Sequence, residues 1–93
     1  APRAFNFPAA DTQASLIAFT LPMALLDRDD VLSGVKVVSV AEERWKRRDI
    51  KSIGLLAQCL GKQAAAEQGC YEAIMVEDGM VTEGTSSSFY IVK

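Results

Sequence analysis

The stretch YEAIMVEDGMVTEG, residues 71–84, carries the clearest fold signal in this sequence. Two runs rich in apolar residues, 71–77 and 80–83, flank the pair Asp78-Gly79. This pair tolerates the positive φ angles of a type I′ turn, which joins two antiparallel strands most tightly. The stretch therefore predicts a β-hairpin.

The length of the turn also predicts which residues of the hairpin face each other. With a two-residue turn, Val76 lies opposite Val81. Counting on along both strands, Ile74 lies opposite Glu83. Glu83 is therefore expected at the end of the second strand, opposite Ile74.

Upstream of the hairpin, the sequence predicts a helix over residues 53–68. Apolar residues recur there at four-residue spacing: Leu56, Leu60 and Ala64. Ser52 is a suitable N-cap residue, and Gly69 stands where a residue in the left-handed conformation ends a helix. Gly54 and Gly61 weaken the helix propensity, which suggests that close packing or a ligand uses the absent side chains.

Three more strands and a loop complete the predicted fold. The strands are expected at residues 15–21, 35–41 and 87–93, where β-branched, aromatic and other apolar residues gather. Residues 1–14, with two prolines and no clear period, predict a loop that leads into the domain. The chain is thus predicted to be α+β, with a largely antiparallel sheet and one main helix.

Composition excludes several kinds of function. The 93 residues allow one small domain, and a net charge of −2 does not favour a nucleic-acid or an anionic membrane partner. The sequence contains no histidine, which excludes Ser-His-Asp and Cys-His catalysis and leaves few zinc ligands, so no metal site is expected. The two cysteines, Cys59 and Cys70, cannot form a disulfide framework, and a cytoplasmic protein with reduced thiols is the expectation.

A basic cluster, Arg44 to Arg48, precedes the predicted helix. It has acidic neighbours at Glu42, Glu43 and Asp49, a pattern typical of a solvated charged face. Lys51 follows this cluster and stands just before the predicted helix start. The positive end of a helix dipole repels an ammonium group, which favours the neutral amine that a Schiff-base lysine needs. The alternative is a solvated surface lysine beside a helix cap.

Glu83 presents a similar choice between a functional and an ordinary residue. It ends a hairpin strand within apolar surroundings, where it is either an edge residue in water or a buried acid with a cationic partner. Gly84 and the hydroxyl run 85–88 follow it. Small residues with hydroxyl groups form a loop that can approach and hydrogen-bond a ligand, although an ordinary Ser/Thr-rich turn has the same composition.

Three segments in the same order also resemble one protein family. RWKRRDIKSIGLL, KQAAAEQGCYEAI and GMVTEGTSSS resemble the D-amino-acid aminotransferase branch of the fold-type IV enzymes that use pyridoxal 5′-phosphate. The resemblance runs from about residue 35 to residue 93. It implies a chain that forms part of the larger, C-terminal domain of such an enzyme, with residues 1–93 as a partial cofactor-binding domain.

The resemblance implies roles for five residues. Lys51 matches the lysine that binds the cofactor as a Schiff base and later moves a proton, and Glu83 matches the acid that pairs with the pyridine nitrogen. Thr85 and Ser86 match loop positions near the cofactor, and Arg44 matches an arginine close to the site. The implied partners are an amino acid, a 2-oxo acid and a second subunit in a homodimer.

The sequence also departs from this family. Ser88 and Gly54 stand where the family usually has asparagine, and the chain is shorter than its members, so a piece of a longer protein is expected. The branched-chain aminotransferase and aminodeoxychorismate lyase branches share the Lys51 and Glu83 equivalents. A non-catalytic interaction module is the alternative from another class, because exposed strand edges favour pairing.

Overall fold

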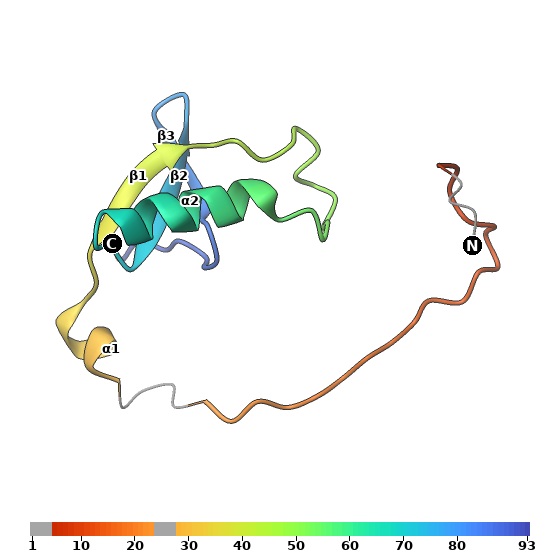
Figure 1. Cartoon of the computed structure of the whole chain (residues 1–93), viewed down its shortest axis with the longest axis horizontal. Helices are drawn as coiled ribbons and strands as arrows, with labels where there is room; N and C mark the ends of the chain where they lie inside the picture. The colour runs from red at the N-terminus through yellow and green to blue at the C-terminus, as the bar shows by residue number, and fades with distance from the viewer. Residues whose placement is uncertain (1–4, 24–27) are drawn as a thin grey trace.

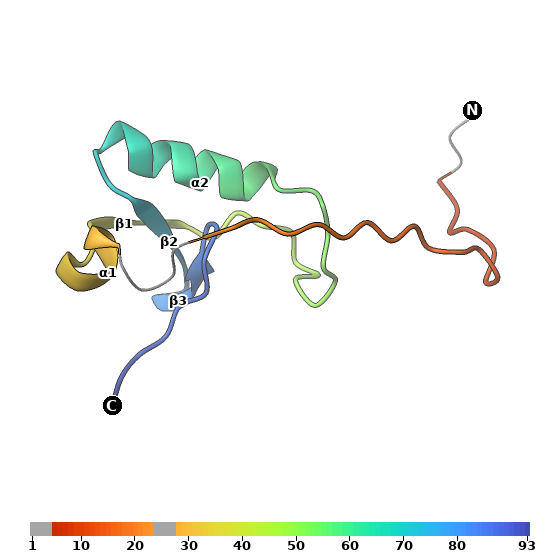
Figure 2. The same cartoon turned by 90° about the horizontal axis from the view of Figure 1, so that it is seen from below.

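The computed structural model describes residues 5–23 and 28–93, which contain a three-stranded sheet and two helices (Figure 1). In chain order these elements are α1 (Asp29–Ser33), β1 (Val37–Ala41), α2 (Leu56–Glu67), β2 (Glu72–Glu77) and β3 (Met80–Gly84). The strands lie in the order β1-β2-β3, and α2 packs across one face of the sheet (Figures 1 and 2). The α+β class is confirmed.

The hairpin of β2 and β3 forms around the predicted turn. Asp78 and Gly79 both have positive φ angles, 51° and 76°, as a type I′ turn requires. Val76 pairs with Val81, as predicted. Glu83, however, pairs with Met75 and not with Ile74, because the register shifts by one residue at the step between Met75 and Val76.

This shift is a β-bulge, in which Thr82 is the extra residue of β3. The Thr82 hydroxyl lies 3.1 Å from the carbonyl oxygen of Met75 and 2.7 Å from Oε2 of Glu42, two partners that the local sequence does not reveal. The bulge puts Glu83 on the face of Met75 and not on the face of Ile74. Met75 is fully buried beneath α2, so Glu83 comes to the helix-covered face of the sheet.

The sheet is mixed, so the prediction of a largely antiparallel sheet is wrong. β1 and β2 are parallel, with Val38 opposite Ala73 and Val40 opposite Met75. The reason is the crossover through α2: the helix carries the chain back to the starting end of β1, so β2 runs in the same direction. The prediction named one main helix, and the described residues also contain the five-residue helix α1.

Helix α2 begins three residues later than predicted. Its N-cap residue is Leu55, with no side-chain capping bond, and the Ser52 hydroxyl instead accepts a hydrogen bond from the Gly54 amide at 3.0 Å. The predicted N-cap role of Ser52 is therefore wrong, because the serine closes a local turn ahead of the helix. The C-terminal prediction is confirmed: Gly69 has a φ of 64°, and the amide of Cys70 reaches the carbonyl of Ala65 at 2.9 Å in a Schellman motif.

Small side chains bring α2 close to the sheet. Ala65, Ala73 and Met75 form the buried apolar core between them. Gly61 is buried at the same contact, where a Cβ atom would lie 2.7 Å from Cγ2 of Thr85. Of the two alternatives expected at Gly61, close packing or a ligand, the structure shows close packing, which brings α2 against the segment that follows β3.

Two predicted strands do not form. Residues 15–21 and 87–93 contain no strand, because β-structure needs a paired backbone and neither stretch pairs with another among the described residues. Residues 5–23 run away from the sheet (Figure 2), and Leu16 is 92% exposed. Of the predicted N-terminal loop, residues 1–4 lie outside the described residues; residues 5–14 contain one turn and neither a helix nor a strand.

Neither of the described helices has the length and apolar character needed to cross a bilayer.

Candidate active site

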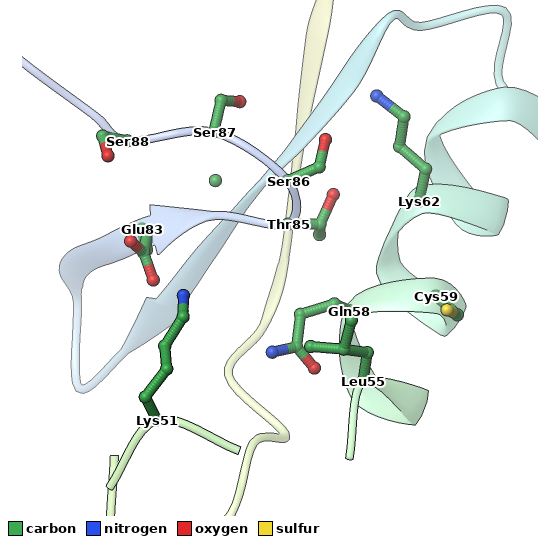
Figure 3. A pocket seen from close by; sticks show the side chains of 11 residues that line it. Lys51, Leu55, Gln58, Cys59, Lys62, Glu83, Thr85, Ser86, Ser87 and Ser88 are labelled. Atoms are coloured by element: carbon green, nitrogen blue, oxygen red, sulfur yellow. The ribbon is translucent and has the colours of Figure 1, made fainter. Parts of the chain in front are cut away.

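An open cavity of about 500 Å³ lies between the start of α2 and the segment that follows β3 (Figure 3). The segment between β1 and α2, residues 42–55, contributes one more wall. Four of the five predicted site residues line this cavity. The full lining comprises Lys51, Leu55, Gln58, Cys59, Lys62, Glu83, Gly84, Thr85, Ser86, Ser87 and Ser88. The fold thus brings Lys51, Glu83, Thr85 and Ser86 together, although 32 positions separate the lysine from the glutamate.

Lys51 enters the cavity from the irregular segment ahead of α2. Its amine points toward the carboxylate of Glu83 (Figure 3). The helix begins at Leu56, five positions after Lys51, and the effect of a helix dipole falls off within the first turn. The predicted placement of Lys51 against the helix N-terminus is therefore wrong; its relevant neighbour is an acid on the sheet.

Glu83 reaches the cavity because of the bulge in β3. Its carboxylate accepts a hydrogen bond from Nη1 of Arg44 at 2.5 Å. Arg44 does not line the main cavity, but it lines a smaller one of about 240 Å³ that Lys51 and Glu83 also border. Arg44 thus contacts Glu83 from the smaller cavity that adjoins the main one.

Arg44 is itself held by Glu42, whose side chain is fully buried. The prediction of a solvated charged face is wrong for this pair, because the chain turns after β1 and folds both side chains inward. The hydrogen bond from Arg44 lowers the pKa of Glu42 to about 2, although burial opposes this shift. Glu42 also raises the pKa of Arg44. Both groups therefore stay charged at neutral pH.

The loop after β3 is organised by Glu72, a residue that the sequence analysis missed. Glu72 is 5% exposed and accepts hydrogen bonds from the hydroxyls of Thr85, Ser86 (2.7 Å) and Ser87 (2.8 Å). Burial would raise the pKa of this carboxyl, but the hydroxyl donors and the Ala73 amide outweigh burial and lower it to about 2.

One signal in the sequence could have revealed Glu72. It is a charged residue at the start of the apolar strand EAIMV, and the hydroxyl run at 85–88 lies beyond the next turn, where a returning strand brings it alongside. A buried carboxylate requires donors, and hydroxyls on the neighbouring strand are suitable ones.

Because an ionised carboxylate cannot donate, the hydroxyl protons of Thr85, Ser86 and Ser87 are directed at Glu72. Their oxygens keep lone pairs that can accept hydrogen bonds. The Gln58 Oε1 atom is also buried without a hydrogen-bond partner among the described residues. The cavity thus combines a primary amine, a carboxylate and several acceptor oxygens, a set that can capture a carbonyl carbon and hold a protonated nitrogen.

Glycine is required where the loop turns back on β3. The Gly84 amide donates to the Ser87 carbonyl at 3.0 Å, and a Cβ atom on Gly84 would lie 2.6 Å from that carbonyl oxygen. Ser88, which stands where an asparagine was expected, lines the cavity at the end of this turn. Gly54, the second departure, lies outside the main cavity and borders two neighbouring ones.

Comparison with known proteins points to one family. A sequence model of that family, described as amino-transferase class IV, matches residues 1–93. The D-alanine aminotransferase of Bacillus licheniformis is 40% identical over 93 residues, which cover all of this chain and 32% of that relative. The D-alanine aminotransferase of Staphylococcus haemolyticus is 38% identical over 95 residues, or 33% of its length. The chain spans about a third of the length of the curated relatives it matches.

Proposed function

Since this chain belongs to the class IV aminotransferase family, we propose that it supplies the reactive amine and the ring-nitrogen acid of a transaminase that uses pyridoxal 5′-phosphate. The observation that carries the proposal is the convergence of Lys51 and Glu83 on one cavity. We further propose that the chain is part of a longer protein, since it spans about a third of its relatives.

The residues around the cavity fit this cofactor. A volume of about 500 Å³ lies within the usual range of roughly 300–1,000 Å³ for small-molecule pockets. When bound, pyridoxal phosphate supplies an aromatic ring that accepts electrons from the carbon next to the substrate amine. Glu83 would accept a hydrogen bond from the protonated ring nitrogen, and Lys51 Nζ would hold the cofactor through its aldehyde carbon.

Lys51 would also move the proton of the reaction. An amine beside the reacting carbon can remove a proton from the α-carbon of an amino acid and return one from the same side. We propose that Thr85 and Ser86 contact the cofactor through their oxygen lone pairs, because Glu72 takes their protons. Arg44, which borders the adjoining cavity together with Lys51 and Glu83, would orient Glu83 and lie close to the cofactor.

The names of the relatives favour one substrate class. Both are called D-alanine aminotransferases, so we propose the transfer of an amino group from a D-amino acid to a 2-oxo acid. The family resemblance supports a homodimer in the cytoplasm. The net charge of −2 supports a protein that binds neither nucleic acid nor an anionic membrane surface.

The 93-residue chain by itself should not catalyse this reaction. The cofactor phosphate and the substrate carboxylate both need cationic or amide donors. Within residues 5–23 and 28–93, each arginine is already paired with an acid, and no arginine lines the main cavity. The donors would then come from parts of the longer protein outside this chain.

Covalent labelling of the full-length protein tests the proposal. Reduction of the cofactor-loaded protein with borohydride, followed by peptide mapping, should place the pyridoxyl label on Lys51. Lys62 is the matched control, because it lines the same cavity while its amine donates to the Tyr71 carbonyl at 2.6 Å. Lys51→Ala should abolish the label and Lys62→Ala should keep it; a label on Lys62, Lys36 or Lys46 would overturn the proposal.

A further inference from the structure

Three charged side chains, Glu42, Arg44 and Glu83, form a continuous chain that ends at the cavity. The Glu42 carboxylate accepts two parallel hydrogen bonds from the Arg44 guanidinium group, from Nε to Oε1 at 2.9 Å and from Nη2 to Oε2 at 2.6 Å. The Arg44 backbone amide also donates to Oε1 at 2.9 Å, and the Thr82 hydroxyl lies 2.7 Å from Oε2. Paired contacts of this kind fix the orientation of a guanidinium group.

The remaining end of the guanidinium group is aimed at Glu83. Nη1 of Arg44 lies 2.5 Å from Oε2 of Glu83, and 15% of the Arg44 side chain is exposed. One cation therefore lies between two carboxylates, one fully buried and one at the cavity. The three groups together carry one negative charge.

Two other cations, Arg48 and Lys51, lie near these groups. Arg48 lies 3.8 Å from Glu42, but its nearer partner is Glu77 at 2.5 Å. Lys51 faces Glu83 from the opposite wall of the cavity (Figure 3). Glu42 is thus the second carboxylate that, together with Glu83, offsets the charge of Arg44.

We propose that Glu42 is a positioning residue for Glu83: it holds Arg44 in place and offsets its charge, so that Glu83 remains a negatively charged acceptor for a protonated nitrogen in the cavity. This inference rests on the proposed function, in which that nitrogen belongs to the cofactor ring. Without Glu42, the charge of Arg44 would fall on Glu83 alone, and the ring nitrogen would hold its proton less firmly.

The test uses the full-length protein loaded with pyridoxal phosphate whose ring nitrogen carries ¹⁵N. The ¹⁵N chemical shift, followed against pH, reports the protonation of that nitrogen directly. Glu42→Gln keeps the shape and removes the charge. Glu43→Gln is the matched control, since Glu43 is the next residue and is exposed.

In Glu42→Gln, the apparent pKa of the ring nitrogen should fall by about one unit or more, and kcat should fall about tenfold with a smaller change in KM. Glu43→Gln should match the wild type. The double variant Glu42→Gln/Arg44→Met removes both charges and should return the nitrogen pKa toward the wild-type value. A purely structural role predicts the opposite, because the second substitution removes a further contact.

Two results would overturn the inference: wild-type titration of the nitrogen in Glu42→Gln, or a lower nitrogen pKa in the double variant than in the single one. If the single variant does not fold, the double variant decides alone, and a nitrogen pKa well over one unit below wild type refutes the role of the Arg44 charge. The labelling of Lys51 separates the two proposals, since a label on Lys51 with unchanged titration refutes only the role of Glu42.

Discussion

Replacing Gly61 by alanine tests how closely α2 packs against the loop that forms the candidate site. The added Cβ atom would lie 2.7 Å from Cγ2 of Thr85 and 3.5 Å from Cγ2 of Val40. Only the first of these distances is shorter than a normal contact. Thr85 cannot simply rotate away, because its hydroxyl is bound to the buried carboxylate of Glu72.

Two opposing free energies decide the result. Overpacking a buried contact costs about 1–3 kcal/mol. Replacing glycine by alanine inside a helix contributes about 1 kcal/mol in the other direction. The expected net effect of Gly61→Ala is a loss of roughly 1 kcal/mol in the free energy of unfolding, within a range of about 0–2 kcal/mol.

In a Thr85→Ser background, Gly61→Ala is expected to change the free energy of unfolding in the opposite direction. Serine keeps the hydroxyl that binds Glu72 and lacks the methyl group Cγ2 that the new Cβ would strike. In this background Gly61→Ala should stabilise the protein by up to about 1 kcal/mol through helix propensity alone. The two substitutions should therefore show a coupling energy of about 1–3 kcal/mol.

Urea unfolding of the four proteins in this cycle, followed by far-ultraviolet circular dichroism, measures that coupling in the full-length protein. An equal effect of Gly61→Ala in both backgrounds would refute the close approach of the helix to Thr85. A stabilising effect in the wild-type background would show that the helix shifts at little cost.

Two other predictions concern pH and activity. Because the pKa of Glu72 is lowered to about 2, its contribution of at most about 3 kcal/mol is present at neutral pH and is lost as the pH falls from the ordinary glutamate range toward 2. Urea unfolding at pH 7 and pH 3 measures how far the free energy of unfolding falls between these two pH values. This fall should be smaller for Glu72→Gln than for the wild type, and the exposed control Glu67→Gln should behave like the wild type. An equal fall in all three proteins would contradict the prediction. The 93-residue chain alone, given D-alanine, 2-oxoglutarate and pyridoxal phosphate, should show no turnover above its Lys51→Ala variant; clear turnover would show that this chain assembles a working site.

Local features of the fold were predictable from short stretches of sequence. The Asp78-Gly79 turn and the helix end at Gly69 follow from backbone angles that few residues adopt, so neighbouring residues suffice to predict them. The helix follows from apolar residues at four-residue spacing, β1 from its β-branched residues, and β2 and β3 from the apolar runs that flank the turn. The start of α2 was predicted three residues too early, because the Ser52 hydroxyl bonds locally to the Gly54 amide.

The candidate site was only partly predictable. Lys51, Glu83, Thr85 and Ser86 were selected by their motifs and by family resemblance, and the structure places all four at one cavity, while their roles remain proposals. The two buried acids, Glu42 and Glu72, were not selected. Glu72 binds hydroxyls 13 to 15 positions away, and Glu42 binds Thr82 at 40 positions and reaches Glu83 only through Arg44. No local pattern marks such partners.

The sequence alone determined the turns, the helix and the residue types that the chemistry needs, because these depend on neighbours in the chain. Tertiary structure decided in which direction the strands run and on which face of the sheet a side chain such as Glu83 lies. The α2 crossover makes β1 and β2 parallel, and the bulge at Thr82 turns Glu83 toward the helix. Contacts with Glu42 and Met75 accompany that bulge, and they exist only once distant strands lie side by side.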